Sequence, residues 1–444
     1  MNVPRIVALG LAAALALAGC TGTPSAPSPS GTTPDREQAC AQAVASIVKA
    51  VDDLVSSYEP SALQASASPS PTASSSAAST ASGSAVSSPE TSGSPSLTAS
   101  ADPLADAVTK AKNEMTSLGC DSATANAELA KGLAAIDPQG AIAKAVWRRV
   151  SASMLGKVDK VSQRILAAGE DLADALARAA PGSTLILPAG TREVPETLVL
   201  LDGVVIAGAG PDATRLHSTA ADAAFIVATD GRIELRDVSL DLSGGPAASG
   251  LIAGPAASVV LTRVRVSGAV AGQGAGGAGV QLSAEGTAGS GRGTTLEVTD
   301  SVFSHNGWAG LVVSGGHRVS IRGATFEANK DVALLFTDSA SGSVSGSTFT
   351  DNGVGVAATG QATPSLLSST IKGGSIGLQF SDKAAPAVDG LKISGSSSAA
   401  VVFGGETGGV LAHVVCTGVH YGIVIGDTSA PTLTGNECEV ARGS

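Results

Sequence analysis

The stretch VFSHNGWAGLVV, residues 302–313, places an imidazole, an amide and an indole within four residues. A histidine can move protons near neutral pH, and a tryptophan offers a flat apolar surface on which a ligand ring can stack. Trp308 is one of only two tryptophans in the chain. By residue type alone, His305 and Trp308 are candidates for ligand contacts.

This stretch is also one copy of a repeat. A column of apolar residues recurs at intervals of 22 or 23 residues, at Phe303, Phe326, Phe349, Ile371, Ile393, Cys416 and Cys438. Two further apolar columns, beginning at Leu311 and Val313, run through six successive units. Short alternating strands at a fixed period near 22 predict a solenoid whose stacked coils share one core.

The repeat unit, with Phe303, Asn306 and Leu311 in fixed places, resembles that of right-handed parallel β-helix proteins, the pectate-lyase-like fold. The segment LADALARAAPGSTLILPAG, beginning at Leu172, resembles the capping helix and first coil of that family. The resemblance covers roughly residues 170–444. It implies an all-β right-handed parallel β-helix with coils of about 22 residues. It implies no single activity, because unrelated functions share this scaffold.

Alignment of the repeat units separates positions that keep one residue type from positions that vary. An asparagine recurs three residues after each phenylalanine, at Asn306, Asn329 and Asn352. Asparagine tolerates left-handed backbone and bonds to neighbouring backbone groups, which predicts a structural column at a tight corner. His305 and Trp308 are replaced by other residue types in the following unit. We therefore expect His305 and Trp308 to be exposed side chains on that corner, available for ligand contacts.

An aspartate recurs on every second unit in another column, which reads Gly315, Asp338, Gly360, Asp382, Gly404 and Asp427. One interpretation is that Asp and Gly alternate as turn formers at a strand end. The other is that Asp338, Asp382 and Asp427 line a groove that binds a cation or a hydroxyl-rich polymer. At strand spacing, neighbouring aspartates lie about 9.6 Å apart, which is marginal even for the carboxylate pair of an inverting glycosidase.

The sequence supplies few parts for catalysis. The resemblance implies polysaccharide lyases, hydrolases and epimerases as the best-known enzymes of this fold, but their acidic pairs and histidine-rich motifs are not visible. Arg318 is a candidate ligand contact, although no acidic residue accompanies it locally. We predict no metal site and no cofactor, with calcium at the aspartate column left open. The chain carries a net charge of −11 without a basic block, which argues against nucleic acid as a partner.

The cysteines predict two disulfides. The helical segments around 35–58 and 102–120 should pack antiparallel, which brings Cys40 next to Cys120. Cys416 and Cys438 occupy neighbouring rungs of the first column, about 4.8 Å apart and within the usual range for a disulfide. Two buried thiols are the alternative for the second pair. The expected bond would staple the last coils.

The first twenty residues predict export. Arg5, an apolar run and small residues before Cys20 form a signal segment, and Leu17–Cys20 resembles a bacterial lipobox, which implies lipidation of Cys20. Ser/Pro-rich segments cannot bury enough apolar surface to fold. The expected divisions are a signal segment at 1–20, a tether at 21–34, a helical region at 35–165 with a disordered insertion at 60–101, and a β-helix domain at 166–444.

Three functions follow from these observations. The first is a monomeric lipoprotein, anchored to the extracytoplasmic face of the membrane, that binds polysaccharide or cell-envelope material through its β-helix. The second is a polysaccharide lyase or glycoside hydrolase of the same fold. The third is a non-catalytic scaffold that presents or binds a partner protein.

Overall fold

The computed structural model describes residues 33–58, 103–201, 203–254, 256–272, 276–283, 293–426 and 428–442. The expected lipidation site Cys20, the insertion at 60–101 and Asp427 lie outside these ranges. The chain divides into two compact units, one containing Leu17–Asp137 and the other containing Pro138–Ser444. Among the described residues, no helix is long and apolar enough to cross a membrane.

The first unit is helical, with α1 Thr33–Ser56, α3 Pro103–Leu118 and α4 Ser122–Ala134. Helix α1 packs against both α3 and α4. The predicted disulfide joins Cys40 near the start of α1 to Cys120 just beyond α3. Gly119 ends α3 with a φ of +64°, a left-handed conformation in which glycine has no Cβ to clash. Antiparallel packing of α1 and α3 therefore follows from the sequence as expected.

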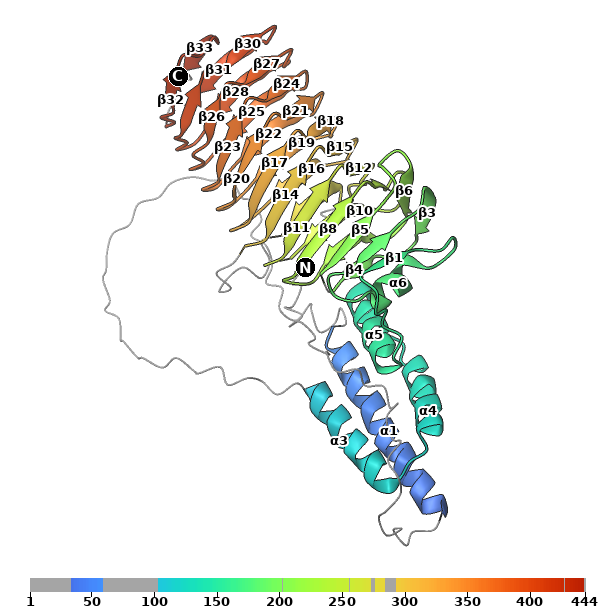
Figure 1. Ribbon diagram of the computed structural model, residues 1–444. Helices are drawn as coiled ribbons and strands as arrows, with labels where there is room; N and C mark the ends of the chain where they lie inside the picture. The colour runs from blue at the N-terminus through green and yellow to red at the C-terminus, as the bar shows by residue number, and fades with distance from the viewer. Residues whose placement is uncertain are drawn as a thin grey trace, which may run out of the picture. The chain divides into compact units, whose positions relative to one another are not determined.

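The second unit contains α5 Ala141–Met154, α6 Leu172–Arg178 and three parallel sheets. The sheets form the sides of a solenoid of stacked coils, as Figure 1 shows. Sheet A comprises β1 Gln163–Ile165, β2 Thr184–Ile186, β5 Val204–Ala207, β8 Arg232–Arg236, β11 Ser258–Thr262, β14 Thr295–Thr299, β17 Arg318–Arg322, β20 Ser341–Ser345, β23 Thr363–Leu367, β26 Ala387–Asp389, β29 Val410–Ala412 and β32 Thr432–Thr434.

Sheet B comprises β3 Gly190–Val194, β6 Thr214–Ser218, β9 Ser239–Asp241, β12 Arg265–Ser267, β15 Val302–Ser304, β18 Thr325–Glu327, β21 Thr348–Thr350, β24 Thr370–Lys372, β27 Lys392–Ser394 and β30 Val415–Thr417. Sheet C comprises β4 Leu198–Leu200, β7 Asp222–Val227, β10 Ala248–Ala253, β13 Ala278–Leu282, β16 Ala309–Val313, β19 Val332–Phe336, β22 Val354–Ala358, β25 Ile376–Phe380, β28 Ala399–Phe403, β31 Tyr421–Ile425 and β33 Val440–Arg442.

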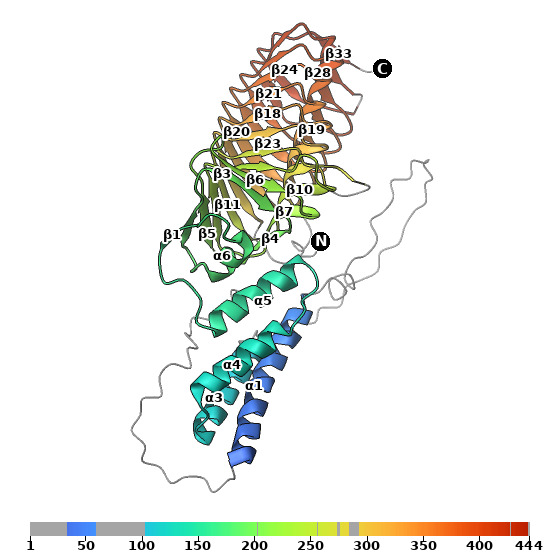
Figure 2. The same cartoon turned by 90° about the vertical axis from the view of Figure 1, so that its right-hand side faces the viewer.

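Each complete coil contributes one strand to each sheet, and the coils follow one another along the solenoid (Figure 2). The sequence prediction of an all-β right-handed parallel β-helix is confirmed. The solenoid begins at β1, which pairs with β2 and so starts three residues before the expected boundary at residue 166.

The inward columns form one continuous core, as the repeat predicts. Phe303, Phe326 and Phe349 are fully buried, and their ring centroids lie 5.1 and 4.9 Å apart. Cys416 and Cys438, two rungs of the same column, form the predicted disulfide with Cα atoms 5.0 Å apart. The stacking follows from the parallel register, which places the same residue of each unit directly above its predecessor.

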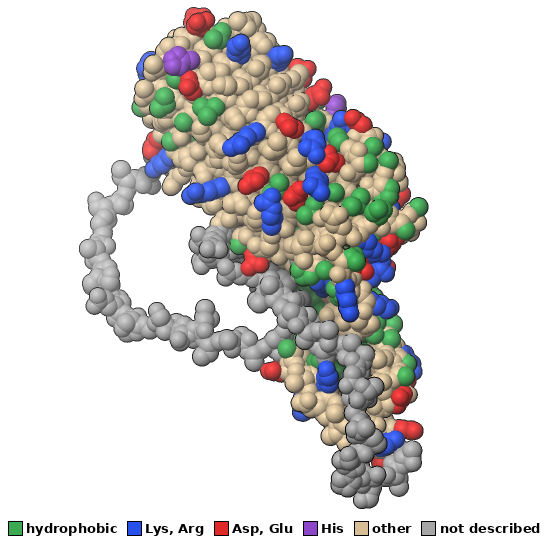
Figure 3. All heavy atoms as spheres, in the orientation of Figure 1, with side chains coloured by type: hydrophobic (Ala, Val, Ile, Leu, Met, Phe, Trp, Pro, Cys, Tyr) green, Lys and Arg blue, Asp and Glu red, His purple; other side chains and the backbone are tan. Residues whose placement is uncertain are grey.

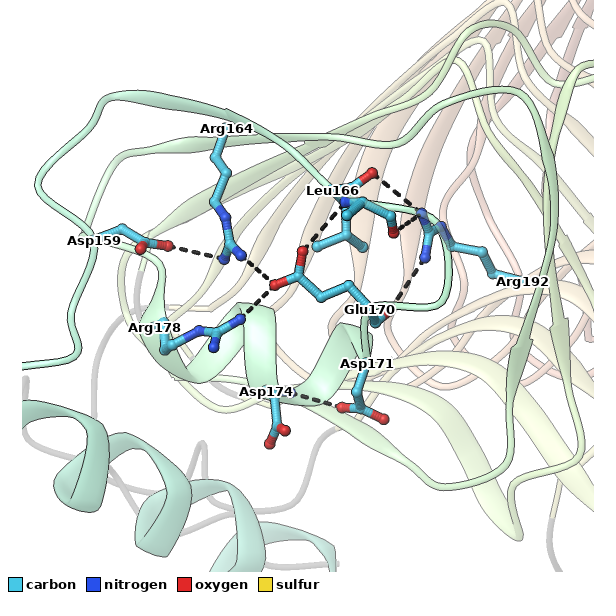
Figure 4. Close-up of polar contacts among 9 residues, drawn as sticks. Asp159, Arg164, Leu166, Glu170, Asp171, Asp174, Arg178 and Arg192 are labelled. Carbon is cyan, nitrogen blue, oxygen red and sulfur yellow. Dashed lines mark hydrogen bonds and ion pairs between the residues drawn. The ribbon is translucent and has the colours of Figure 1, made fainter.

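The first coil is closed by α6 and a group of ion pairs (Figure 4). Glu170 accepts hydrogen bonds from Arg164 and Arg178, and Arg164 also pairs with Asp159 at 3.0 Å. Arg192 donates to the main-chain carbonyls of Leu166, Ala167 and Glu170. These contacts tie α6 to the first coil and cover the end of the core.

Candidate binding surface on the solenoid

The corner between sheets B and C is held by a ladder of buried asparagines. Asn306 Nδ2 donates to Asn329 Oδ1 at 2.8 Å, and Asn329 Nδ2 donates to Asn352 Oδ1 at the same distance. Each amide also bonds to the main chain: Asn329 Nδ2 donates to the Phe303 carbonyl, and Asn352 Nδ2 to the Phe326 carbonyl. The predicted structural column is present, and it fixes the exit of each strand of sheet B.

His305 precedes this ladder at a position that requires left-handed backbone. Its φ is +55°, and the equivalent residues Ala328 and Asp351 have φ values of +51° and +52°. The imidazole is exposed. Trp308 lies three residues further on, where the chain enters sheet C. The prediction that it is exposed is wrong, because its side chain packs against the apolar cluster of sheet C and is partly buried. Both residues therefore border the same face, the outer face of sheet C.

That outer face is apolar. Ala278, Ala309, Val312 and Val332 form a buried cluster separate from the core, with Trp308, Leu335, Val354 and Ala357 packed against it. The parallel register continues this strip through Ile376, Ala399, Val402 and Val424 to Tyr421. We name the strip, from Trp308 to Tyr421 and Val424, the sheet C platform. Because strands of sheet C are apolar toward both the core and the outside, their sequences read as nearly continuous hydrophobic runs.

Asp338 and Asp382 lie on the opposite border of the platform, at the corner between sheets C and A. Each adopts a left-handed conformation, with φ values of +59° and +57°. Asp338 Oδ2 accepts from the Gly315 amide at 3.1 Å, and Asp382 Oδ2 accepts from the Gly360 amide at 3.1 Å and from the Thr359 hydroxyl. The bond from Thr359, followed by that from Gly360, lowers the pKa of Asp382 below its ordinary value.

The alternation of aspartate and glycine has a steric reason. The register of Phe380 with Phe403 places Gly405 in this column, so the spacing-based prediction of Gly404 is wrong by one residue. A Cβ added to Gly360 would lie 2.9 Å from the Asp338 carbonyl oxygen, and one added to Gly405 would lie 2.8 Å from the Asp382 amide nitrogen. Each aspartate therefore bonds to the glycine amide of the coil before it and requires a glycine in the coil after it. This geometry supports the turn-forming interpretation, and ligand binding by these carboxylates stays a prediction.

Arg318 lies on a different face. It projects from β17 on the outside of sheet A, in register with Thr295 and Ser341. The neighbouring charged residues on this face are Arg232, Glu234, Arg236, Glu297 and Arg322. Figure 3 shows basic and acidic side chains interspersed over this part of the solenoid. The structure thus brings His305, Trp308, Asp338 and Asp382 to the borders of the platform and places Arg318 elsewhere.

Sequence reasoning missed a charged cluster on sheet B. Asp241 is buried and accepts from Arg215 and from the Ser243 amide, and its Oδ2 lies 3.3 Å from His217 Nδ1. Burial raises the pKa of Asp241, but the bonds from Arg215 and Ser243 outweigh burial and lower it overall. Arg215 and His217 come from β6 and Asp241 from β9, and no local spacing in the sequence predicts that they meet. Since both carboxylate oxygens of Asp241 have hydrogen-bond partners, the cluster stabilises the contact between neighbouring coils.

His317 is buried and joins two segments that are distant in sequence. Its Nδ1 accepts from the Thr294 amide at 2.7 Å, and its Nε2 faces the Ser283 carbonyl at 2.6 Å, which fixes the neutral imidazole with hydrogen on Nε2. Burial lowers the pKa of His317, and the bond to Ser283 opposes that shift only in part. The ring therefore bridges both sides of the excursion between residues 283 and 294.

This geometry predicts acid sensitivity. Above the ordinary histidine pKa of 6.5, His317 is neutral in both folded and unfolded chains. As the pH falls below that value, the unfolded chain takes up a proton that the folded chain resists, so the free energy of unfolding decreases. Urea unfolding at about pH 7.5 and 5.5 measures this loss. His317→Ala, which copies Ala340 at the same corner of the next coil, should have a smaller pH dependence. If the free energy of unfolding of His317→Ala depended on pH as strongly as that of the wild type, His317 would not be the source of the acid sensitivity.

No group of three or more metal-ligating side chains occurs among the described residues. Calcium at the aspartate column therefore has no assembled site in the described part of the chain, where Asp338 and Asp382 each bond to main-chain amides. Asp427, the third aspartate of that column, lies outside it.

Residues 278–438 match the family model described as "Right handed beta helix region". No curated protein matches the chain. Similar solved structures include "Catalytic domain of GH87 alpha-1,3-glucanase in complex with nigerose", at 13% identity and a TM-score of 0.34, with 64% of this chain and 66% of that chain covered. Another is "Crystal structure of pectate lyase Pel9A", at 14% identity and a TM-score of 0.37, with 62% and 72% covered. Likenesses this distant say nothing about what this chain binds.

Proposed function

We propose that this chain, whose solenoid is a right-handed parallel β-helix, binds polysaccharide on the sheet C platform without cleaving it. The platform itself carries the proposal. It is an uncharged apolar strip with Trp308 and Tyr421 at its two ends and polar corners along both sides. Sugar rings present apolar C–H faces and hydroxyl edges, and a surface with an apolar centre and polar borders matches both.

Binding without cleavage follows from the carboxylates at the platform. Acid–base cleavage of a glycosidic bond needs two free carboxyl groups about 5–5.5 or 6.5–9.5 Å apart. Asp338 and Asp382 stand two coils apart and each engages a main-chain amide of the preceding coil. Their carboxylates stabilise turns, which leaves the platform suited to hold a chain rather than to protonate its linkages.

Trp308→Ser should weaken glycan binding about tenfold, because loss of an aromatic side chain that anchors a ligand typically costs more than 1 kcal/mol. Serine occupies the equivalent position in later coils, at Ser375 and Ser398, so the corner accepts it. A glycan array, followed by titration of the best-bound polymer with full-length protein, measures the effect. Leu367→Ala, which removes an exposed apolar side chain from sheet A, is the control and should bind normally. Unaltered binding by Trp308→Ser would exclude the platform.

One observation favours a second candidate, a hydrolase that acts on sheet A. Glu234 and Glu297 both pair with Val260 from neighbouring coils and so share one outward column, about 9.6 Å apart at strand spacing. That separation is at the upper limit for an inverting pair. Release of reducing ends from a polysaccharide panel, abolished by Glu297→Gln, would establish hydrolysis. Failure of every glycan to bind would instead favour the scaffold function.

The proposed location of the protein is the extracytoplasmic face of the membrane, where lipidated Cys20 would hold it. The lipobox-like residues Leu17–Cys20 and the preceding apolar run support this proposal. Two or more acyl chains give a stable anchor, at about 0.8 kcal/mol per buried CH₂. Cells fed labelled palmitate should therefore yield labelled protein in the membrane fraction. Cys20→Ser should abolish the label and shift the protein to the soluble fraction, and retention of both would refute lipidation at Cys20.

A further inference from the structure

We propose that the sheet C platform selects an extended, uncharged glycan that runs along the solenoid axis with one sugar ring over each coil. This inference rests on the proposed function and adds the ligand's charge, direction and minimum length. It is carried by three features of the platform: the distance between its two aromatic ends, the apolar floor between them, and the charges on its borders.

The register sets the direction and the length. Ala309, beside Trp308, pairs with Val332, and the same column continues through Val354, Ile376 and Ala399 to Tyr421. Five coil steps therefore separate the aromatic ends, or about 24 Å at the spacing of parallel strands. A linear glycan whose rings repeat at about the strand spacing would place one ring on each coil, so roughly six rings would reach from Trp308 to Tyr421.

The column between the aromatic residues carries only aliphatic side chains, those of Val332, Val354, Ile376 and Ala399. Val332 and Ala399 are buried, at 6% and 4% exposure, and Val354 and Ile376 between them are partly exposed. Tyr421 stands above the neighbouring Ala399 with 54% of its surface exposed, and its ring contacts His420 at 4.3 Å in an edge-on arrangement. The exposed ring can receive the apolar face of a sugar while its hydroxyl remains in water.

The borders offer hydroxyl and amide partners. Ser375 and Ser398 lie 3.1 Å apart on the B–C corner and are both exposed. Thr337 and Thr359 lie on the C–A corner, each bonded to the carboxylate of Asp338 or Asp382. Gln379 projects from the strip itself and is exposed. These groups exchange hydrogen bonds with sugar hydroxyls on both sides of the chain.

The border charges disfavour an acidic polymer. Asp331, Asp338 and Asp382 are exposed along the two corners, and the whole chain carries a net charge of −11. Lys330 and Lys383 also flank the platform, but Lys383 pairs with Glu406 at 3.4 Å. The strip between the corners has no charged residue from Val312 to Val424 in its described outward positions. A polyanion would be repelled at the borders and gain no cation on the floor.

The test is a length series of linear neutral gluco-oligosaccharides, from disaccharide to octasaccharide, titrated against full-length protein by calorimetry. Affinity should rise until the chain reaches about six rings and then level off, because a chain held at one aromatic end meets the other at high effective concentration. Polygalacturonate should bind at least tenfold more weakly than a neutral polymer of equal length, and the neutral affinities should not change with added salt.

Tyr421→Ala is the matched variant, because Ala399 stands at that position in the preceding coil. It should lower hexasaccharide affinity to that of a trisaccharide while leaving the trisaccharide affinity within about threefold of wild type. Equal affinities for disaccharide and hexasaccharide, or tighter binding of polygalacturonate, would overturn this inference and leave the proposed function standing. Absence of binding to every glycan would overturn the proposed function as well.

Discussion

Replacing Asn329 with alanine should lower the free energy of unfolding by about 3–4 kcal/mol, because it leaves several buried polar groups without partners. Asn329 is 1% exposed. Its Oδ1 accepts from the Asn306 side chain and main chain, and its Nδ2 donates to Asn352 and to the Phe303 carbonyl. The substitution thus breaks the ladder at its middle rung and leaves polar groups in the coils on both sides without their hydrogen-bond partners.

Chemical denaturation monitored by far-ultraviolet circular dichroism measures this loss. Ser396→Ala is the matched control, because Ser396 occupies the same column and makes one long bond, of 3.4 Å, to the Gly373 carbonyl. The control should lose less than about 1 kcal/mol. Equal losses for the two variants would mean that the corner is held by backbone conformation alone and that the amide ladder contributes nothing.

Replacing Glu170 with alanine should destabilise the solenoid by about 2 kcal/mol, since it leaves the partly buried Arg178 at the end of the core without a carboxylate partner. The side chain of Glu170 is 16% exposed and accepts from both Arg164 and Arg178. Arg164 keeps Asp159 after the substitution, but Arg178, whose Nε already has no hydrogen-bond partner, loses its carboxylate. Because coils contact only their neighbours, loosening the first coil lets the solenoid fray from that end.

Hydrogen exchange followed by mass spectrometry locates this effect. Amides of β1, β2 and α6 should exchange faster in Glu170→Ala, while those of β16 to β25 stay protected. Glu406→Ala, which breaks an exposed pair with Lys383, is the control and should exchange like the wild type. Uniformly faster exchange along the whole solenoid would contradict a local role for Glu170.

The repeat predicted the fold because its periodicity reports packing directly. Phe303, Phe326 and Phe349 recur at one interval, and only a stack of coils places such residues on one another. The same register predicted the disulfide between Cys416 and Cys438. The start of the solenoid was harder to predict from the sequence. Strand β1 has only three residues, of which Gln163 and Ile165 are exposed, and it lacks the apolar columns of the later coils.

The binding surface was only partly predictable. His305 and Trp308 stood out because they vary within a regular unit, and both border the platform. The platform itself did not, because outward apolar residues such as Val312 and Leu335 look in sequence like further core positions. Asp338 stood out for its spacing, but a left-handed turn produces the same spacing as a ligand site. Spacing along the chain specifies the coil position, and contacts decide what a residue does there.

The measurement that tests the central claim most directly is the fluorescence of Trp308 during a glycan titration. Trp147→Phe removes the other tryptophan, so the remaining emission reports the platform alone. If sugar rings lie against Trp308, a neutral hexasaccharide should shift the emission to shorter wavelength with saturation, and Tyr421→Ala should weaken that titration. An emission spectrum that stays constant while the same protein binds the glycan by calorimetry would contradict the account and place the site on another face.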